Sequence, residues 1–404
     1  MAEALHRAAV RPAATTVNIA LCFAAAVLEG FDIQAIGVAA PKLAPELGIP
    51  PDELGWVFFA SNLALVIGAS FGGWLADKRG RKPVFVGAVA TFGVATFATM
   101  FVVSFETLLA ARIGAGFGFG AALPNIMAIA ADISRPERRA STATMIFCGM
   151  PLGGGFVAFF TQMLPSDYDW RTLFLVGGLL PVLLTPALIY FMRETHLEAN
   201  GGPRPRVDVM KALFGEGRAG PTLLLWTIFF PTLLILYLIL YWLPSLVVAK
   251  GFERAVAPQA AVAFNWASVV GALVLGRIVD RFGGRWPLTV AYGALIGIVA
   301  WLAVANGLPL IVALSGAAGV FLMGANYSLY GIAASYYPAA MRGTGSGAAI
   351  AVGRVGAIIG PLLPGLLLSS GASVDQVIFL MVPAAAIAGA AVFALGFFKP
   401  PVEA

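Results

Sequence analysis

Long apolar runs make up most of the chain, and short polar segments separate them. Within each run the apolar residues are continuous, whereas the strands of a membrane barrel alternate between apolar and polar positions. Only helices and closed barrels can span a bilayer, and a spanning helix needs about 20 mostly apolar residues. The pattern therefore predicts an all-α membrane protein with twelve transmembrane helices. The predicted spans are 17–41, 54–76, 83–104, 106–130, 141–164, 172–192, 221–247, 258–280, 286–305, 308–332, 342–369 and 374–397.

Composition agrees with this reading and narrows the functional classes. The 404 residues are 60% hydrophobic and 11% charged, whereas a soluble domain has about 25% charged residues. Cys22 and Cys148 lie inside apolar runs, where they are expected to be small packing residues. His6 and His196 lie outside the spans. We therefore expect no metal site and no cofactor. Because the spans show no constellation of nucleophile, base and metal ligand, we also expect that the protein is not an enzyme.

Lys and Arg residues are distributed unequally between the two sides of the predicted membrane protein. Lys and Arg are concentrated in the loops after the second, fourth, sixth, eighth and tenth spans and at both termini. We call the side of the membrane on which these loops and termini lie the basic side. The opposite side has only Lys42, Arg171, Lys250 and Arg254. Such asymmetry encodes membrane orientation and predicts that the basic side and both termini are cytoplasmic. The net charge of +5 is therefore not interpreted as a nucleic-acid-binding surface.

The chain divides into two predicted halves. Residues 193–220 are rich in charge, Gly and Pro, and they predict a cytoplasmic linker between an N-terminal six-helix half, 1–192, and a C-terminal six-helix half, 221–404. An internal repeat supports the division. Its matching positions, at one constant offset, are Gly73 and Gly276, Asp77 and Asp280, and Gly80 and Gly283. Transporters built from two such halves are one known plan of membrane protein.

The loop after the second span has an acid among basic residues. The Asp77 carboxylate can accept hydrogen bonds from free N–H groups at the start of another helix, and neighbouring arginines such as Arg81 can pair with it. Such a latch would break when the halves rock, and Asp280 repeats the acid in the second half. The alternative for the basic residues of this loop is that they only set topology.

Four ionisable residues lie deep inside predicted spans: Glu29, Asp32, Arg112 and Arg354. A charge at this depth costs roughly 2.5–3.5 kcal/mol on insertion scales, so such residues indicate function or mutual pairing. Glu29 and Asp32 share one helix face, and two close carboxylates favour uptake of a proton. Arg112 could reach the surface of the bilayer or pair with Asp32. Arg354 could bind a substrate carboxylate with its planar guanidinium, or form a structural ion pair with an acid of the first span.

The sequence resembles the major facilitator superfamily. Residues 72–82 (GGWLADKRGRK) are similar to the signature loop of that superfamily, and residues 112–120 (RIGAGFGFG) to its Arg-and-glycine motif in the fourth span. Residues 28–32 (LEGFD) resemble the Asp-Gly-x-Asp motif of the aromatic acid:proton symporter family, with Glu in place of the first Asp. Residues 120–125 and 353–356 add to a likeness to permeases for 3-(3-hydroxyphenyl)propionate.

The resemblance implies a secondary transporter that takes up an aromatic carboxylate together with protons, by alternating access, in the inner membrane and as a monomer. Glu29, Asp32 and Arg112 would then couple protons, Arg354 would hold the carboxylate, and Arg342 would join the gate. An aromatic substrate needs an apolar pocket with a few polar groups. The candidates for it are Asn125, Tyr237, Tyr241, Phe264, Asn265, Asn326 and Tyr327.

Two alternatives remain open at this point. The tyrosines could belong to an interfacial aromatic belt instead of the substrate pocket. Residues 150–155 (MPLGGG) resemble the glycine and proline motif of some antiporters, so that proton-driven efflux of a small organic molecule is the alternative function. A proline with three glycines also makes a helix bendable, whatever the direction of transport.

Overall fold

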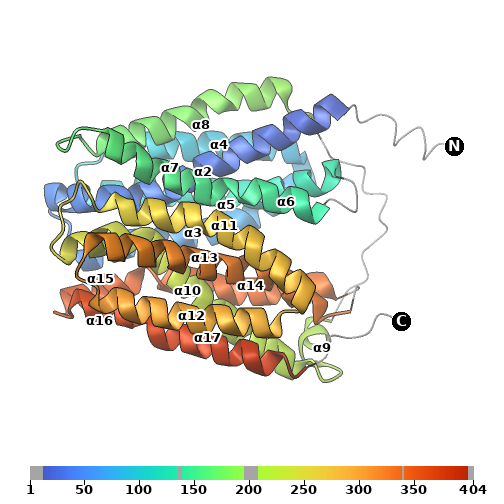
Figure 1. Cartoon of the computed structure of the whole chain (residues 1–404). Coiled ribbons are helices and arrows are strands. Elements are labelled where there is room, and N and C mark those ends of the chain that lie inside the picture. The colour runs from blue at the N-terminus through green and yellow to red at the C-terminus, as the bar shows by residue number, and fades with distance from the viewer. Residues whose placement is uncertain (1–11, 135–138, 195–207, 339–340, 399–404) are drawn as a thin grey trace. The chain divides into compact units, whose positions relative to one another are not determined.

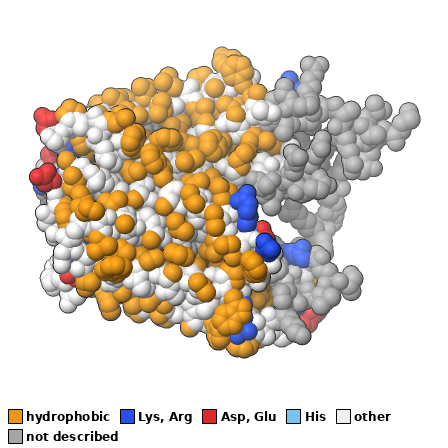
Figure 2. Space-filling model, in the orientation of Figure 1, with side chains coloured by type: hydrophobic (Ala, Val, Ile, Leu, Met, Phe, Trp, Pro, Cys, Tyr) orange, Lys and Arg blue, Asp and Glu red, His pale blue; other side chains and the backbone are white. Residues whose placement is uncertain are grey.

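A computed structural model of the chain describes residues 12–134, 139–194, 208–338 and 341–398 (Figure 1). Regular structure in these ranges is helical throughout. Twelve helical segments within them are long and apolar enough to cross a membrane, which confirms the predicted number. Figure 2 shows hydrophobic side chains over the broad middle of the face in view, with charged side chains toward its margins.

Contacts between Cα atoms group the chain into two compact units. Unit 1 comprises residues 1–39 and 60–202, and unit 2 comprises residues 40–59 and 203–404. The turn after the first span, with the adjoining helix ends, therefore groups with unit 2. The helices of the first half are α2 (Pro12–Leu47), α3 (Pro51–Arg79), α4 (Arg81–Thr99), α5 (Phe105–Ile133), α6 (Arg139–Phe147), α7 (Gly149–Met163) and α8 (Arg171–Phe191).

The remaining helices all belong to unit 2. They are α9 (Val209–Phe214), α10 (Ala219–Ala249), α11 (Pro258–Phe282), α12 (Arg285–Val304), α13 (Leu308–Ser335), α14 (Arg342–Ile359), α15 (Leu362–Ser369), α16 (Val374–Phe379) and α17 (Met381–Leu395). The predicted spans 342–369 and 374–397 each consist of two consecutive helices here, and so does the span 141–164 in unit 1.

Glycines bring the helices of unit 1 into close contact. A Cβ added to Gly120 of α5 would lie 1.9 Å from the Leu65 carbonyl oxygen of α3, and one added to Gly153 of α7 would lie 1.9 Å from the Val27 carbonyl oxygen of α2. Between membrane helices, where lipid is as apolar as the side chains, such close backbone packing supplies much of the stability. The glycine pattern thus determines that α5 packs on α3 and α7 on α2.

Unit 2 repeats this arrangement. Gly319 of α13 approaches the Phe264 carbonyl oxygen of α11, and Gly356 of α14 approaches the Phe230 carbonyl oxygen of α10, so that an added Cβ would lie 2.1 Å from each oxygen. The second and fourth spans of unit 1 thus correspond to the eighth and tenth of unit 2. The first and fifth correspond to the seventh and eleventh. This equivalence is the pseudo-symmetry that the repeat in the loop predicted.

Part of the predicted linker folds onto unit 2. Residues 195–207 lie outside the described residues, but Asp208 begins the short helix α9. The buried Arg218 side chain donates hydrogen bonds to the carbonyl oxygens of Ala212 and Lys211, at 2.9 and 3.0 Å. Its Nη1 lies 2.6 Å from a carboxylate oxygen of Glu216, and this hydrogen bond lowers the pKa of Glu216. Arg218 therefore fixes α9 to the beginning of α10.

Candidate functional site

Asp32 and Arg112 form a buried ion pair in unit 1. Nη2 of Arg112 lies 2.6 Å from Oδ2 of Asp32, and Nη1 lies 3.1 Å from Oδ1. The side chains are 0% and 1% exposed. The guanidinium also lies 5.9 Å from the ring centroid of Phe174 on α8. Of the two alternatives for Arg112, the structure thus shows pairing across α2 and α5, in the bidentate geometry that favours a carboxylate.

Glu29 lies one turn from this pair on α2 and is 1% exposed. Next to it, Gly30 packs against the Met150 carbonyl oxygen of α7, which holds this turn of α2 within the helix bundle. Two buried carboxyl groups and one guanidinium are therefore concentrated in the middle of unit 1. Two ionised carboxylates repel each other in a low dielectric.

The glycine motif around Arg112 is explained by packing. Gly116 faces the Ser61 carbonyl oxygen of α3, and Gly118 faces Phe92 of α4. Residues 150–155, which favoured the antiport alternative, have a similar role, because Gly153 packs on α2. The glycines therefore allow the helices to pack closely, whereas Arg112 forms the ion pair with Asp32.

Arg354 lies on α14 of unit 2 and is half-buried. Its Nη1 donates a hydrogen bond of 2.9 Å to the hydroxyl oxygen of Tyr237 on α10. Tyr330 of α13 interacts electrostatically with Arg354 and lies close to the side chain of Asn326. Tyr330 was not among the candidates predicted from the sequence, although it lies one turn after Asn326 and so shares its helix face. Two helices, α10 and α13, thus each place a phenol group near this guanidinium.

An aromatic column extends from Tyr237 along α10. The ring centroids of Tyr237 and Tyr241 are 6.3 Å apart, and the Tyr241 ring stacks on Phe58 of α3 at 4.6 Å. Trp242 contacts Phe58 edge-on at 5.6 Å and donates a hydrogen bond to the Pro361 carbonyl oxygen. These residues all belong to unit 2. Tyr237 and Tyr241 are 7% and 2% exposed, so both side chains lie inside the protein.

Beyond the column, the first turn of α3 packs on α15. Gly55 and Gly365 meet there, and a Cβ added to Gly365 would lie 2.4 Å from the Pro51 carbonyl oxygen. The Ser369 hydroxyl donates a hydrogen bond of 2.8 Å to the Asp52 carboxylate. This end of α3 therefore covers unit 2 on the side opposite to the basic one.

The remaining candidates for the substrate pocket are placed as follows. Asn125 and Asn265 are buried, and each donates a side-chain hydrogen bond of 2.8 Å to the carbonyl oxygen four residues earlier in its own helix. Phe264 is 1% exposed in the contact of α11 with α13. Tyr327 is half-buried on α13. Among the pocket candidates, Tyr237 contacts Arg354 directly, through the hydrogen bond of 2.9 Å.

The gating candidates of unit 1 surround the start of α4. Arg81 forms a salt bridge with Asp132 of α5 and donates a hydrogen bond of 3.0 Å to the Ala128 carbonyl oxygen. Asp77 is exposed and interacts electrostatically with Arg81. The Glu194 carboxylate accepts hydrogen bonds from the first backbone N–H groups of α4, at 3.2 Å. Acids other than Asp77 thus pair with Arg81 and cap α4 within unit 1.

The signal for these two acids was present in the sequence. Asp132 and Glu194 each lie near the end of a span that ends on the basic side. In unit 2, Asp280 is exposed at the end of α11, and Arg342 is half-buried at the start of α14. The described residues contain no group of three or more His, Cys, Asp or Glu side chains that could hold a metal ion.

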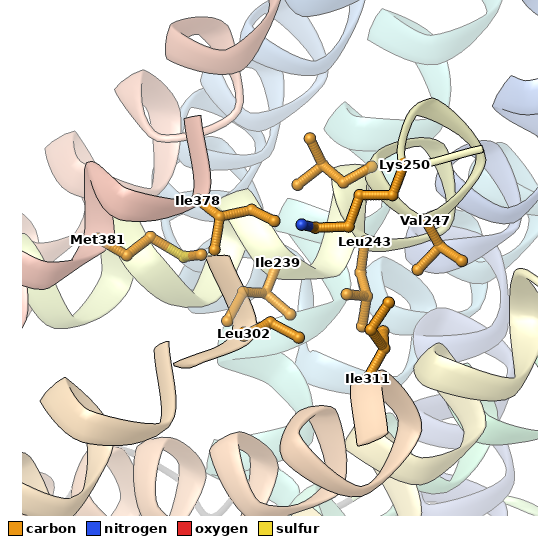
Figure 3. Close-up of a pocket in the computed structure, with 9 residues that line it drawn as sticks. Ile239, Leu243, Val247, Lys250, Leu302, Ile311, Ile378 and Met381 are labelled. Atoms are coloured by element: carbon orange, nitrogen blue, oxygen red, sulfur yellow. The ribbon is translucent and has the colours of Figure 1, made fainter. Parts of the chain in front are cut away.

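A small apolar pocket in unit 2 contains one lysine (Figure 3). Lys250 extends between Leu302 and Ile378, and its Nζ bonds the Ala303 carbonyl oxygen and the Asp375 carboxylate, each at 2.6 Å. The cavity volume is about 10 Å³, which leaves room for a single water molecule. This pocket is too small for an organic substrate, and Lys250 instead connects the ends of α10, α12 and α16.

Comparison with known proteins identifies the family. A profile described as Major Facilitator Superfamily matches residues 22–264 and 251–404. The chain belongs to this superfamily. The chain is 35% identical to a 3-(3-hydroxy-phenyl)propionate transporter of Escherichia coli, over 94% of its own length and 93% of that protein's. It is 32% identical to a 4-hydroxybenzoate transporter of Pseudomonas aeruginosa, over 94% and 92%.

A gallate transporter of Pseudomonas putida is also 32% identical, over 94% of this chain and 91% of that protein. Among solved structures, a bacterial homolog of the human lysosomal transporter Spinster, in an inward-facing and occupied conformation, has a TM-score of 0.77. It shares 16% identity and covers 96% of this chain and 98% of its own, so it shows the fold alone. Members of this superfamily are transporters rather than enzymes, and the chain is accordingly a multi-pass membrane transporter.

Proposed function

We propose that this protein takes up an aromatic carboxylate together with protons. The observation that carries the proposal is Arg354, a half-buried guanidinium that is held by the Tyr237 hydroxyl at one end of an aromatic column. A guanidinium recognises a carboxylate through two parallel hydrogen bonds, and aromatic side chains accept a ring. The relatives that transport hydroxyphenylpropionate, hydroxybenzoate and gallate support this substrate class.

In this proposal, unit 2 binds the substrate. The carboxylate replaces the Tyr237 hydroxyl as the partner of Arg354, and the ring lies against the tyrosines of α10. Asn326 and Tyr330 provide hydrogen-bonding groups for a ring hydroxyl on the adjacent helix face. A site that hydrogen-bonds a hydroxyl discriminates strongly against substrates that lack it, because its own polar groups are then left unpaired.

Unit 1 carries the proton in this scheme. Protonation of Asp32 or Glu29 neutralises one carboxylate and weakens the pair with Arg112. Rearranging a buried neutral carboxyl group costs much less free energy than rearranging a buried ionised carboxylate. The proton enters from the more acidic compartment and leaves into the near-neutral cytoplasm, and the change of charge biases a two-state equilibrium between outward-open and inward-open forms.

The basic side is proposed to face the cytoplasm, in accordance with the positive-inside rule. Both termini would then lie in the cytoplasm. The protein is further proposed to be a monomer in the bacterial inner membrane. Asp77, Arg81, Asp280 and Arg342 lie at helix ends on this side, and in this proposal they control opening toward the cytoplasm.

The test is a substrate screen in proteoliposomes with an imposed pH gradient, acidic outside. Labelled 3-(3-hydroxyphenyl)propionate, 4-hydroxybenzoate, benzoate and a neutral sugar are offered separately. The proposal predicts accumulation of at least one aromatic acid, abolished by a protonophore, and no accumulation of the sugar. Accumulation only when the gradient is reversed would instead assign the protein to efflux, and accumulation of none of the acids would refute the substrate class.

A further inference from the structure

Arg285, the first residue of α12, lies in a cage of aromatic rings on the basic side of unit 2. Its Cζ atom is 3.8 Å from the ring centroid of Phe397 and 4.5 Å from that of Phe393, and the Trp286 ring is 5.4 Å away. A Cβ added to Gly396 would lie 2.2 Å from Cδ of Arg285, so this glycine makes room for the side chain. The guanidinium is therefore held in one position before any ligand binds.

The charge of Arg285 is not neutralised by the described part of the chain. No salt bridge or side-chain hydrogen bond joins it to another described residue, and its Nε is shielded from water without a hydrogen-bond partner. The rings interact with the face of the guanidinium. The N–H groups of the two Nη atoms remain available as donors, in the fork geometry that suits a phosphate.

The equivalent position in unit 1 has partners within the chain. The offset that pairs Gly80 with Gly283 also pairs Lys82 with Arg285. Nζ of Lys82 donates a hydrogen bond of 2.7 Å to the Ile189 carbonyl oxygen, and its backbone N–H bonds the Glu194 carboxylate at 3.2 Å. The same offset places Phe397 where unit 1 has Glu194. Unit 2 thus has an aromatic ring in place of the acid.

The aromatic cage is open to the membrane. Trp286 is 61% exposed and Phe397 66% exposed, at the ends of two spanning helices that pack against each other (Figure 1). Aromatic rings at the ends of spans lie at the level of the lipid headgroups. A second guanidinium, of Arg281, lies 5.3 Å from the exposed ring of Phe282 nearby in the chain. The surroundings are therefore apolar, positively charged and at headgroup depth.

We propose that Arg285 binds the phosphate of an anionic phospholipid of the basic-side leaflet. The guanidinium edge takes two phosphate oxygens, and the Trp286 and Phe397 rings pack against the glycerol region. The acyl chains lie on the lipid-facing surface of α12, where Val290 is exposed. The bound lipid would supply, for unit 2, the anion that Glu194 supplies in unit 1.

The experiment measures lipid binding to the purified full-length protein in a neutral detergent. Phosphatidylglycerol is titrated, and bound lipid is counted by native mass spectrometry. Arg285→Gln is expected to bind it about tenfold more weakly or worse, because the charge-assisted pair is lost. Arg277→Gln is the matched control, since Arg277 is an exposed arginine of the same side whose Nη1 bonds only the Leu273 carbonyl oxygen in its own helix.

Further arms separate the possible ligands. Phosphatidylcholine is expected to bind weakly to all variants, and inorganic phosphate at equal concentration should not displace phosphatidylglycerol. Equal phosphatidylglycerol binding by Arg285→Gln and the wild-type protein would overturn the proposal, and so would full displacement by inorganic phosphate. If Arg285→Gln does not fold, Phe397→Leu keeps the charge and removes one wall of the cage. Unchanged binding by this variant would likewise contradict the proposal.

Discussion

Arg112 and Arg354 are both guanidinium groups within membrane-spanning helices, but their partners differ in charge. Arg112 is paired with the Asp32 carboxylate in a fully buried site. Arg354 is half-buried and bonds the neutral Tyr237 hydroxyl. Arg112 is enclosed together with the carboxylate that neutralises it, whereas the Arg354 side chain is partly accessible to an approaching anion. Arg354 is therefore the better candidate for the substrate carboxylate.

Replacing Arg354 by Lys tests this assignment. Arg354→Lys keeps the charge but loses the bidentate fork, so affinity for an aromatic acid should fall about tenfold or more, which is roughly 1.4 kcal/mol or more. Equilibrium binding of labelled substrate measures the change. Arg277→Lys, an exposed site, is the control and should bind as the wild-type protein does. An unaltered affinity in Arg354→Lys would remove this residue from the site.

At this scale the sequence predicted which residues are chemically unusual, but not their contacts. Glu29, Asp32, Arg112 and Arg354 stood out because charge is rare in apolar runs. The pairing of Arg112 with Asp32 stayed open, since both reaching the surface and pairing agree with its position. Tyr330 was missed because a tyrosine near the end of a span also fits an interfacial belt.

At the scale of helices, glycine positions decide which elements touch. Gly72 and Gly73 are neighbours in α3 but have different surroundings. A Cβ on Gly72 would lie 2.5 Å from the Ala121 Cα atom, whereas a Cβ on Gly73 would have nothing within 4 Å. Small residues let membrane helices approach closely, so only the first glycine is expected to be required for packing.

Gly72→Val is therefore expected to separate α3 from α5 and to lower the melting temperature of the purified protein, with a loss of about 1–3 kcal/mol as for other overpacked cores. Gly73→Val, in the same helix and the same motif, should have little effect. Thermal unfolding in detergent compares the two variants. Equal melting temperatures for both would show that the contact at Gly72 does not stabilise the fold.

The first turn of α3 is a second element with a testable role. Residues 51–59 group with unit 2, whereas residues 60–79 of the same helix group with unit 1. If the first turn of α3 moves with residues 60–79 of its helix during transport, the contact of Asp52 with Ser369 has to break in each cycle. The Asp52→Cys and Ser369→Cys double variant should therefore form a disulfide that stops uptake until a reductant is added.

Uptake in this variant is measured in proteoliposomes before and after reduction, and each single cysteine variant serves as a control. The native Cys22 and Cys148 are buried and should not react. Binding of substrate should persist in the oxidised protein. Transport that continues at the same rate with the disulfide formed would show that this contact is static.

Helix existence was predictable, but helix interruptions were not. The three divided spans all break four residues before a proline: Phe147 precedes Pro151, Gly360 precedes Pro364, and Phe379 precedes Pro383. A proline clashes with the carbonyl group four residues earlier. Other prolines, such as Pro124 and Pro231, lie inside unbroken helices. Tertiary packing therefore decides which prolines break a helix, and the sequence alone does not reveal it.

At the scale of the whole molecule, the pattern of apolar runs was enough to predict the architecture, and the motifs were enough to predict the family. Apolar runs predicted the twelve helices, and residues 72–82 pointed to the superfamily that the comparisons confirm. The position of α9 could not be predicted, because it depends on side-chain hydrogen bonds from Arg218 to the carbonyl oxygens of Ala212 and Lys211, which no periodic pattern reveals.

The most direct measurement compares accumulation with exchange in proteoliposomes that contain Asp32→Asn. The account predicts that this variant fails to accumulate the aromatic acid under an inward proton gradient, because Asn cannot take up the proton. Exchange of labelled for unlabelled substrate, which needs no net proton movement, should continue. Accumulation by Asp32→Asn to the wild-type level would contradict the account.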